Sequence, residues 1–268
     1  MTQTKNKNIA IFINGVDSVF AIDSLRGQDF EDWQCFLVNC SIEKIKDYVN
    51  QDPRFHIINE SKNIIDIIQN IPCEYVFMIN SNDVFAPNAL TGLARIIDLG
   101  NTDIIKCPSI KFSKYNEFEN LSGGFDYIFQ NKEILKYFFE LPLYLCINKK
   151  LFEKTDFNTV PDLWMLTMLN VAQNMALAHG TYILHQMNTD IFSNRKNYRD
   201  VIDYYCKNKQ MFSIDFWKKF FKCFIPKFVK NTIKDNDKLT FTYCAKKIPL
   251  HFIPLKYKFI FFIMKAFN

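Results

Sequence analysis

Short apolar runs alternate with amphipathic stretches over the first hundred residues of the chain. The apolar runs have the length and composition of buried strands. The stretches between them repeat apolar residues every three or four positions, which predicts helices. This alternation predicts an α/β fold with a mostly parallel sheet that is flanked by helices. The predicted strands are 8–14, 33–38, 55–58 and 75–79, and the predicted helices are 16–27, 41–49 and 63–71.

The pattern is less regular in the middle of the chain. Pro87 begins another helical pattern, since proline favours the first turn of a helix. The same argument predicts a long helix from Pro161 to about Ala176. Residues 111–130 mix polar and aromatic side chains without a clear period. Further short strands are predicted at 104–107, 145–148 and 181–186, with a turn of helix at 149–153.

The composition excludes several classes of protein. With 268 residues, 49% of them hydrophobic, the chain has enough core for one large domain or a domain with an extension. It has only 7 Gly and no GxGxxG or GxxxxGK[ST] motif, which argues against a dinucleotide-binding or P-loop protein. The 8 Cys form no CxxC pair, and the polar residues 1–8 lack the apolar core of a signal peptide. We therefore expect a cytoplasmic protein with reduced thiols.

The charge is concentrated in one part of the chain. Residues 207–268 contain 14 Lys and 3 Asp, a balance of +11, whereas the whole chain carries +5. Residues 1–206 therefore carry about −6, which is 5 minus 11. A strongly basic segment on an acidic body predicts an anionic partner surface.

Aromatic residues accompany these lysines. In the predicted helix 215–229, five of them share one face, and a second segment at 246–265 also mixes Lys with aromatic residues. This pattern favours contact with an anionic membrane through residues 207–268. The alternative is that the aromatic face packs on the body formed by the preceding residues, 1–206, or on a second subunit. Nucleic-acid binding is not favoured, because no nucleic-acid-binding module is visible. The aromatic face consists of Phe216, Trp217, Phe220, Phe221 and Phe224.

Polar residues follow three of the predicted strands at the point where each strand ends. The first ends at Asn14, the second at Asn39, and the fourth at Asn80. Open α/β sheets bind ligands at the carboxyl ends of their parallel strands. We therefore expect these three residues to line one cleft.

The segment around Asn80 also carries a family resemblance. Residues 75–87 run from a strand through Asn80, Ser81, Asn82 and Asp83 to Pro87. This block resembles the strand-DxDD-turn-Pro signature of family 2 glycosyltransferases of the GT-A fold. The two acids of the DxD pair are here Asn80 and Asn82, so the motif is degenerate and only Asp83 keeps its charge. Further segments resemble the family in the same order, namely 11–17, 24–28, 33–41, 151–162 and 182–192, so the resemblance covers about residues 8–195.

The resemblance implies a GT-A domain over residues 1–205, followed by a basic helical extension at 206–268. It also implies an inverting transfer of a sugar from a nucleotide-sugar donor, UDP-linked by expectation. Such a reaction needs a carboxylate to take the acceptor proton, and Asp162 falls where the family places it. Pro161 replaces the glutamate that usually precedes this residue. The alternative is that Asp162 only stabilises the first turn of a helix.

The same resemblance assigns the binding residues. The nucleotide-sugar residues would be Asn14, Asp17, Asn39, Asn80, Asn82 and Asp83. Mg²⁺ or Mn²⁺ would be held by Asp83 and Asn82, with His185 as a weaker candidate. Because an amide oxygen is a poorer ligand than a carboxylate, we expect weak metal binding or metal independence. The alternatives are that residues 80–83 only cap the helix near Pro87 and that His185 is structural.

Two functions follow from these expectations. The first is a glycosyltransferase that acts on a lipid-linked or cell-surface glycan, such as a lipopolysaccharide or capsule precursor, at the inner face of the cytoplasmic membrane. The second is an inactive binding or scaffolding subunit of a glycan-assembly complex, which the substituted DxD motif favours. The sequence leaves open whether the chain forms a homo-oligomer.

Overall fold

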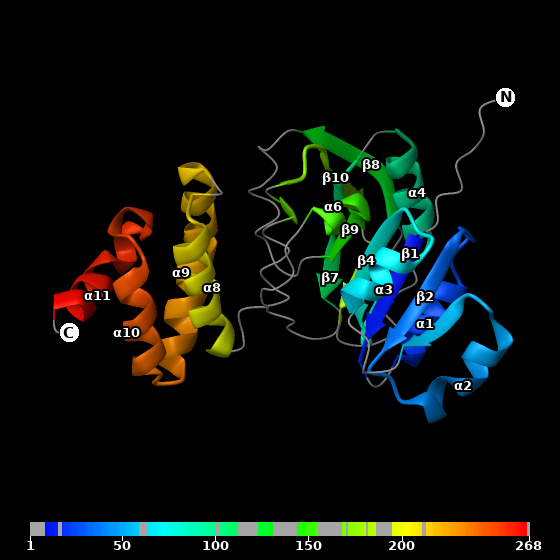
Figure 1. The fold of residues 1–268 in the computed structure, drawn as a ribbon, viewed down its shortest axis with the longest axis horizontal. Helices are drawn as coiled ribbons and strands as arrows, with labels where there is room; N and C mark the ends of the chain where they lie inside the picture. The colour runs from blue at the N-terminus through cyan, green and yellow to red at the C-terminus, as the bar shows by residue number, and fades with distance from the viewer. Residues whose placement is uncertain are drawn as a thin grey trace. The chain divides into compact units, whose positions relative to one another are not determined.

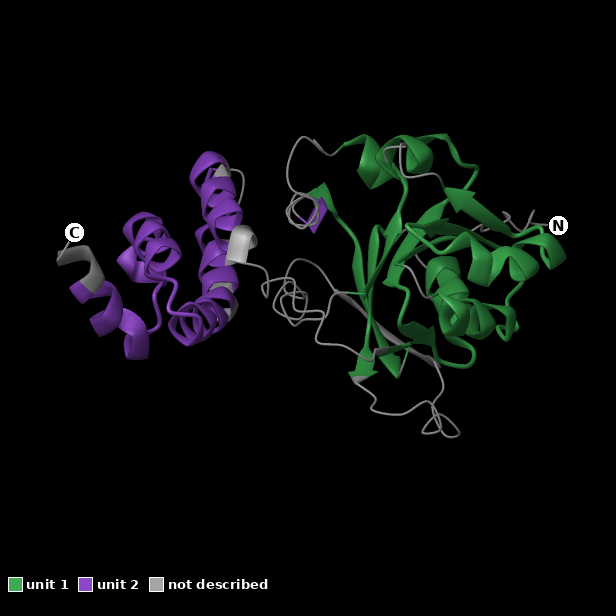
Figure 2. Cartoon of the chain, turned by 90° about the horizontal axis from the view of Figure 1, so that it is seen from below, with its two compact units in different colours: residues 1–134, 143–155, 171–188 green, residues 135–142, 156–170, 189–268 purple. Residues whose placement is uncertain are grey.

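The structure is a computed structural model, and its described parts form two compact units (Figure 2). The first unit comprises residues 1–134, 143–155 and 171–188, and the second comprises residues 135–142, 156–170 and 189–268. The structure describes residues 9–15, 18–58, 64–99, 102–111, 123–130, 144–154, 168–169, 171–180, 182–185, 195–210 and 213–266.

The first unit is built on a mostly parallel sheet of eight strands in the order β3-β2-β1-β4-β9-β6-β10-β8 (Figure 1). Only β9 and β8 run against the other six strands. The bounds are β1 Ile9–Asn14, β2 Trp33–Val38, β3 Phe55–Ile58, β4 Tyr75–Asn80, β6 Ile104–Cys107, β8 Gly123–Gln130, β9 Tyr144–Asn148 and β10 Met175–Gly180.

Helices cover both faces of this sheet, because both faces of its strands are apolar. Ile9, Ile11 and Ile13 of β1 join one buried cluster with residues of α1, α2 and α4. On the opposite face Phe12 and Phe36 stack with ring centroids 5.0 Å apart, and α3 and α6 contact each other. The helices are α1 Val19–Arg26, α2 Ile42–Gln51, α3 Ile64–Asn70, α4 Ala89–Leu99 and α6 Lys150–Glu153. The α/β architecture predicted from the sequence is confirmed.

A second sheet of three short strands lies in the same unit. It has the order β5-β11-β7, with β5 Asp83–Phe85, β11 Ile183–His185 and β7 Ser109–Lys111. The middle strand pairs antiparallel with β5 and parallel with β7. This small sheet therefore joins the segment after β4 to two segments that come much later in the chain.

The predicted helix from Pro161 to Ala176 is wrong at its carboxyl end. Met175–Gly180 is the strand β10, which pairs with β6 and β8 inside the large sheet. The sequence Met-Ala-Leu-Ala has high helix propensity. Pairing on both sides and burial of Met175, Ala176 and Ala178 override that preference.

The carboxyl-terminal part of the second unit is helical. Its elements are α8 Arg195–Asn208, α9 Ile214–Lys234, α10 Lys238–Lys247, the 3-10 helix η4 Leu250–Phe252 and α11 Leu255–Ala266. Helix α10 contacts α8, α9 and α11 (Figure 1). The expected domain boundary at 205/206 falls inside α8. This helix packs on α10, and both helices belong to the second unit.

The aromatic face of α9 forms the core of this unit and is not a lipid-facing surface. Trp217 and Phe220 are each 2% exposed, and Phe221 and Phe224 are fully buried. Tyr205 of α8 lies edge-on to Trp217 and Phe221, with centroids 4.7 and 5.0 Å away. The expectation that these four residues meet a membrane is therefore wrong, because burial among other aromatic rings removes them from any outer surface. The side chain of Phe216 lies outside the described residues.

No helix in the described part of the chain has the length and apolar content that crossing a membrane requires.

Candidate active site

Three asparagines lie together where adjacent parallel strands end. Asn14 of β1 pairs with Asn80 of β4 on one side and with Val38 of β2 on the other, and Asn39 follows Val38 directly. The Asn39 side-chain nitrogen donates a 2.9 Å hydrogen bond to the side-chain oxygen of Asn14. The expectation that these strand ends share one edge of the sheet is confirmed.

The turn after β1 requires glycine. Gly15 has φ +134°, a backbone conformation that side chains disfavour. A Cβ at this position would come within 2.9 Å of the Ser81 Cβ, closer than real contacts allow. The Ser81 N–H donates to the Asn14 carbonyl at 2.9 Å, and the Gly15 N–H donates to the Val38 carbonyl at 3.0 Å. The three strand ends are therefore held in close register by their backbones.

Asn39 has the left-handed backbone conformation, with φ +54°. Asparagine tolerates this conformation better than most residues do. Asn39 and Asn14 are both exposed, so their amides are accessible to a ligand at this edge. Burial raises the pKa of the neighbouring Cys40 thiol, so this thiol stays protonated at neutral pH.

Asp83 closes the turn that connects β4 to β5. Its side chain is only 1% exposed. One carboxylate oxygen accepts hydrogen bonds from the Asn80 backbone N–H at 2.8 Å and from the Asn80 side-chain nitrogen at 3.2 Å. The charge of Asp83 therefore stabilises the strand end that carries Asn80.

The start of α4 is bound by a different residue, Gln28. The Gln28 side-chain oxygen accepts from the Leu90 N–H at 3.1 Å, and its nitrogen donates to the Ala86 carbonyl at 3.0 Å. Ser24, one turn earlier, accepts from the Phe85 N–H at 3.0 Å. These contacts fix the end of α1 to residues 85–90. This segment directly follows the turn that contains Asp83, so the position of that turn is fixed as well.

Residues 24–28 are one of the segments that resemble the family, but the sequence interpretation assigned no binding or positioning role to Ser24 or Gln28. The available signal was their spacing of four residues at the end of an amphipathic helix, which places two polar groups on its buried face. Gln28 is buried, and a buried amide must find hydrogen-bond partners. The pattern could therefore have predicted a fixed contact, although not its partners.

The three-stranded sheet aligns the backbones of two further titratable residues with that of Asp83. His185 of β11 is the register partner of Asp83 in β5 and of Lys111 in β7. The backbones of a carboxylate, an imidazole and an ammonium residue therefore form one row. The side chains of His185 and Lys111 lie outside the described residues.

The described oxygen donors fit a divalent cation poorly. Asp83 supplies the one carboxylate of the β4–β5 turn, and an oxygen of it already accepts two hydrogen bonds. Asn82 supplies a neutral amide, whereas Mg²⁺ and Ca²⁺ sites depend on carboxylates. Among the described side chains, no group of three His, Cys, Asp or Glu is arranged to hold a metal. We therefore derive no reaction step through a metal.

Two of the predicted site residues fall outside the described part of the chain. These are Asp17, an expected nucleotide-sugar residue, and Asp162, the expected general base. Their roles remain predictions from the family resemblance.

Comparison with known proteins identifies the fold. No family model matches the sequence, and no curated protein matches it significantly. Among solved structures, S. aureus TarS residues 1–349 in complex with UDP-GlcNAc has a TM-score of 0.72 at 11% identity, over 97% of this chain and 87% of that one. The complex of the same fragment with UDP has a TM-score of 0.70 at the same identity and coverage.

A longer TarS structure matches with a TM-score of 0.68 at 11% identity. The match covers 97% of this chain and 53% of the TarS chain. TarS has the GT-A fold. The GT-A fold expected from the sequence is therefore confirmed for this chain.

Proposed function

We propose that this chain is a glycosyltransferase that takes its sugar from a nucleotide-sugar, with UDP as the expected nucleotide. One observation carries this proposal. Asn14, Asn39 and Asn80 lie at adjacent strand ends on one edge of the sheet, in a fold shared with TarS structures that contain UDP and UDP-GlcNAc. This edge is the general ligand site of open parallel sheets.

In this proposal the asparagine amides hold the nucleotide. Asn39 would bond the edge of the base, and Asn14 and Asn80 would bond the ribose, since an amide both donates and accepts hydrogen bonds. Neutral amides lack the charge assistance of the family's usual acids, so the affinity should be modest. Asp83 would act indirectly, by fixing the Asn80 amide through its two hydrogen bonds.

The chemical step is an inverting transfer to an acceptor hydroxyl. Asp162 would take the proton from that hydroxyl as it attacks the sugar. The diphosphate leaving group must also be stabilised. Because the described oxygen donors fit a divalent cation poorly, we propose that Lys or Arg side chains stabilise this leaving group.

The acceptor we propose is a lipid-linked or cell-surface glycan, such as a lipopolysaccharide or capsule precursor. The support for it is the basic charge of residues 207–268, which suits a place at the inner face of the cytoplasmic membrane. This part of the proposal concerns location and acceptor, and it stands apart from nucleotide binding.

A second function, an inactive GT-A subunit that binds or organises other components, is favoured by one specific observation. The only carboxylate retained from the motif is buried and hydrogen-bonded to Asn80. A site with amides in place of the acids can keep its geometry and still lack the charged groups that catalysis needs.

A thermal-shift panel of nucleotide-sugars, with and without Mn²⁺, tests the first step. A ligand that binds the folded chain raises its melting temperature by mass action. We expect UDP and at least one UDP-sugar to raise it, with little added effect of Mn²⁺. If no nucleotide or nucleotide-sugar raises it, the transferase proposal is wrong. Binding without turnover in a transfer assay with lipid extracts would favour the inactive subunit.

A further inference from the structure

Helix α11 carries an apolar stripe on its outer surface. Leu255, Phe259 and Phe262 are 82%, 72% and 63% exposed. With Ile263 they occupy positions i, i+4, i+7 and i+8, which form one face of a helix. So much exposed apolar surface on adjacent turns is typical of an interaction site.

The opposite face of α11 is already used for packing. Phe261 is fully buried, with its ring centroid 5.5 Å from that of Phe241 and 6.3 Å from that of Phe228. The helix is therefore anchored on the core of the helical unit by one face and presents the other outward. The residues of the exposed stripe therefore take no part in packing the core of the helical unit.

Lysines flank the stripe on both sides. At 100° per residue, Lys256 lies next to Ile263 around the helix, and Lys258 lies next to Phe262. Both lysines are exposed. Residues 238–268 contain six Lys and no Asp or Glu. Helix α11 therefore contributes only positive charge beside the stripe, and a nearby acidic residue, Asp237, lines the hollow between α9, α10 and α11.

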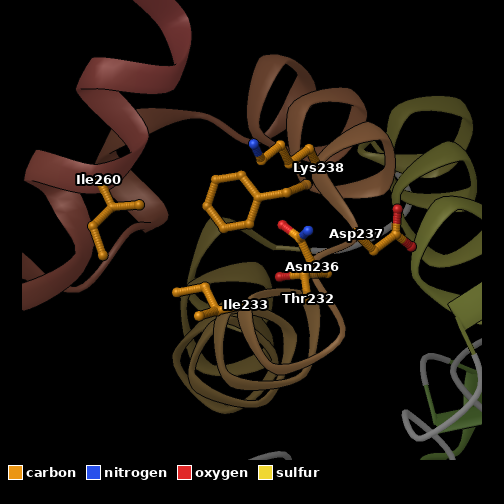
Figure 3. Close-up of a pocket in the computed structure, with 7 residues that line it drawn as sticks. Thr232, Ile233, Asn236, Asp237, Lys238 and Ile260 are labelled. Atoms are coloured by element: carbon orange, nitrogen blue, oxygen red, sulfur yellow. The ribbon is translucent and has the colours of Figure 1, made fainter.

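An apolar hollow opens beside the same helix. It has a volume of about 210 Å³ and lies between the end of α9, the start of α10 and Ile260 of α11. Figure 3 shows Ile233 and Ile260 on two sides of it and Lys238 at its edge. Ile233 is itself exposed, so apolar surface continues from α11 toward α9.

We propose that the outer face of α11 docks on an anionic lipid surface. Apolar residues bounded by lysines match the boundary between acyl chains and anionic headgroups. A helix of 12 residues is about 18 Å long, so it would lie in the interface and not cross it. This assignment deepens the membrane location included in the proposed function, and it replaces the aromatic face of α9 with that of α11.

The lysines also distinguish a lipid surface from a second copy of the chain. Two copies that paired through this stripe would bring Lys256 and Lys258 of each toward those of the other, and like charges repel. An anionic membrane instead attracts each of them. Charge complementarity therefore favours lipid as the occupant.

Vesicle co-flotation of the full chain tests the proposal. The vesicles would contain phosphatidylglycerol and phosphatidylethanolamine in one series and phosphatidylcholine alone in the other, each at low and high salt. We expect binding to the anionic vesicles that weakens with salt. Phe259→Ser with Phe262→Ser should abolish it, and Lys256→Gln with Lys258→Gln should weaken it by about 30-fold, or about fivefold per lysine.

The matched control is Leu99→Ser, because Leu99 is 61% exposed on α4 of the other unit. It should bind vesicles like the wild type. Nucleotide thermal shifts of the same preparations show that each variant is folded and separate this proposal from the proposed function. Unchanged flotation of the Phe259→Ser, Phe262→Ser variant would overturn the assignment. The assignment would also be overturned if the wild-type chain does not bind vesicles but forms a dimer through the stripe in sedimentation.

Discussion

One carboxylate oxygen of Asp83 accepts hydrogen bonds from both the backbone and the side-chain nitrogen of Asn80, at 2.8 and 3.2 Å. Asn80 ends β4 at the edge where the candidate nucleotide site lies, whereas Asp83 begins β5 in the small sheet. The charge that remains from the degenerate motif therefore supports the geometry of the site. This relationship allows positioning and chemistry to be tested separately.

Asn82→Asp should make nucleotide binding depend more strongly on Mn²⁺. The change supplies an anionic oxygen beside Asp83, and hard cations prefer such ligands. We expect Mn²⁺ to raise UDP affinity about tenfold more in the variant than in the wild type, or about 1.4 kcal/mol, by calorimetry. Asn50→Asp, an exposed position on α2, is the control. If wild type already binds Mn²⁺ tightly and the variant behaves like it, the ligand assignment is wrong.

Gln28→Ala should destabilise the first unit and weaken nucleotide binding together. The variant leaves the Leu90 N–H and the Ala86 carbonyl without their Gln28 partner. Loss of a buried partner costs about 1–3 kcal/mol of unfolding free energy, which urea denaturation can measure. Gln69→Ala, on the exposed face of α3, should cost little. Unaltered stability in Gln28→Ala would mean that this contact does not fix the β5–α4 segment.

Asp162→Asn should separate binding from catalysis. The substitution keeps the size of the side chain and removes the base, so transfer should fall by about 10²–10⁴-fold. UDP binding should remain near that of the wild type. The exposed Asp66→Asn on α3 serves as the control for loss of a carboxylate. Equal turnover of the Asp162→Asn variant and the wild type would exclude Asp162 as the base.

Asp203→Asn should weaken the helical unit in a pH-dependent way. Burial opposes ionisation of Asp203, but hydrogen bonds from Lys247 and Tyr243, at 2.5 and 2.7 Å, outweigh it and lower the pKa of the carboxyl. A lowered folded-state pKa stabilises the fold above the unfolded pKa of about 3.9, and this stabilisation is lost as the pH falls through the folded value.

At pH 7 we expect the Asp203→Asn variant to be about 0.5–1 kcal/mol less stable, because solvent screens this half-exposed group. The difference from the wild type should shrink as the pH is lowered below 4. Denaturation of both proteins at pH 7, 5 and 3.5 measures it. Asp215→Asn, at an exposed position on α9, provides the comparison. A stability difference that stays constant over this range would refute the electrostatic explanation.

The repeating strand–helix pattern was sufficient to predict the first half of the fold. Strands β1 to β4 lie where the apolar runs placed them, and Asn14, Asn39 and Asn80 meet because parallel strands end at a common edge. These features are local or follow from general rules of α/β topology. The uneven distribution of charge also needs no structure, since it is a count along the chain.

Contacts between distant segments decided the rest. Met175–Gly180 is a strand because β6 and β8 pair with it, despite its helical composition. The aromatic residues of α9 are core because Tyr198, Tyr205 and Phe252 from other elements pack on them. Gln28 finds its partners 58 and 62 positions away. Periodicity shows which face of a helix is apolar, but only the tertiary structure shows what covers that face, because burial depends on partners far away in the sequence.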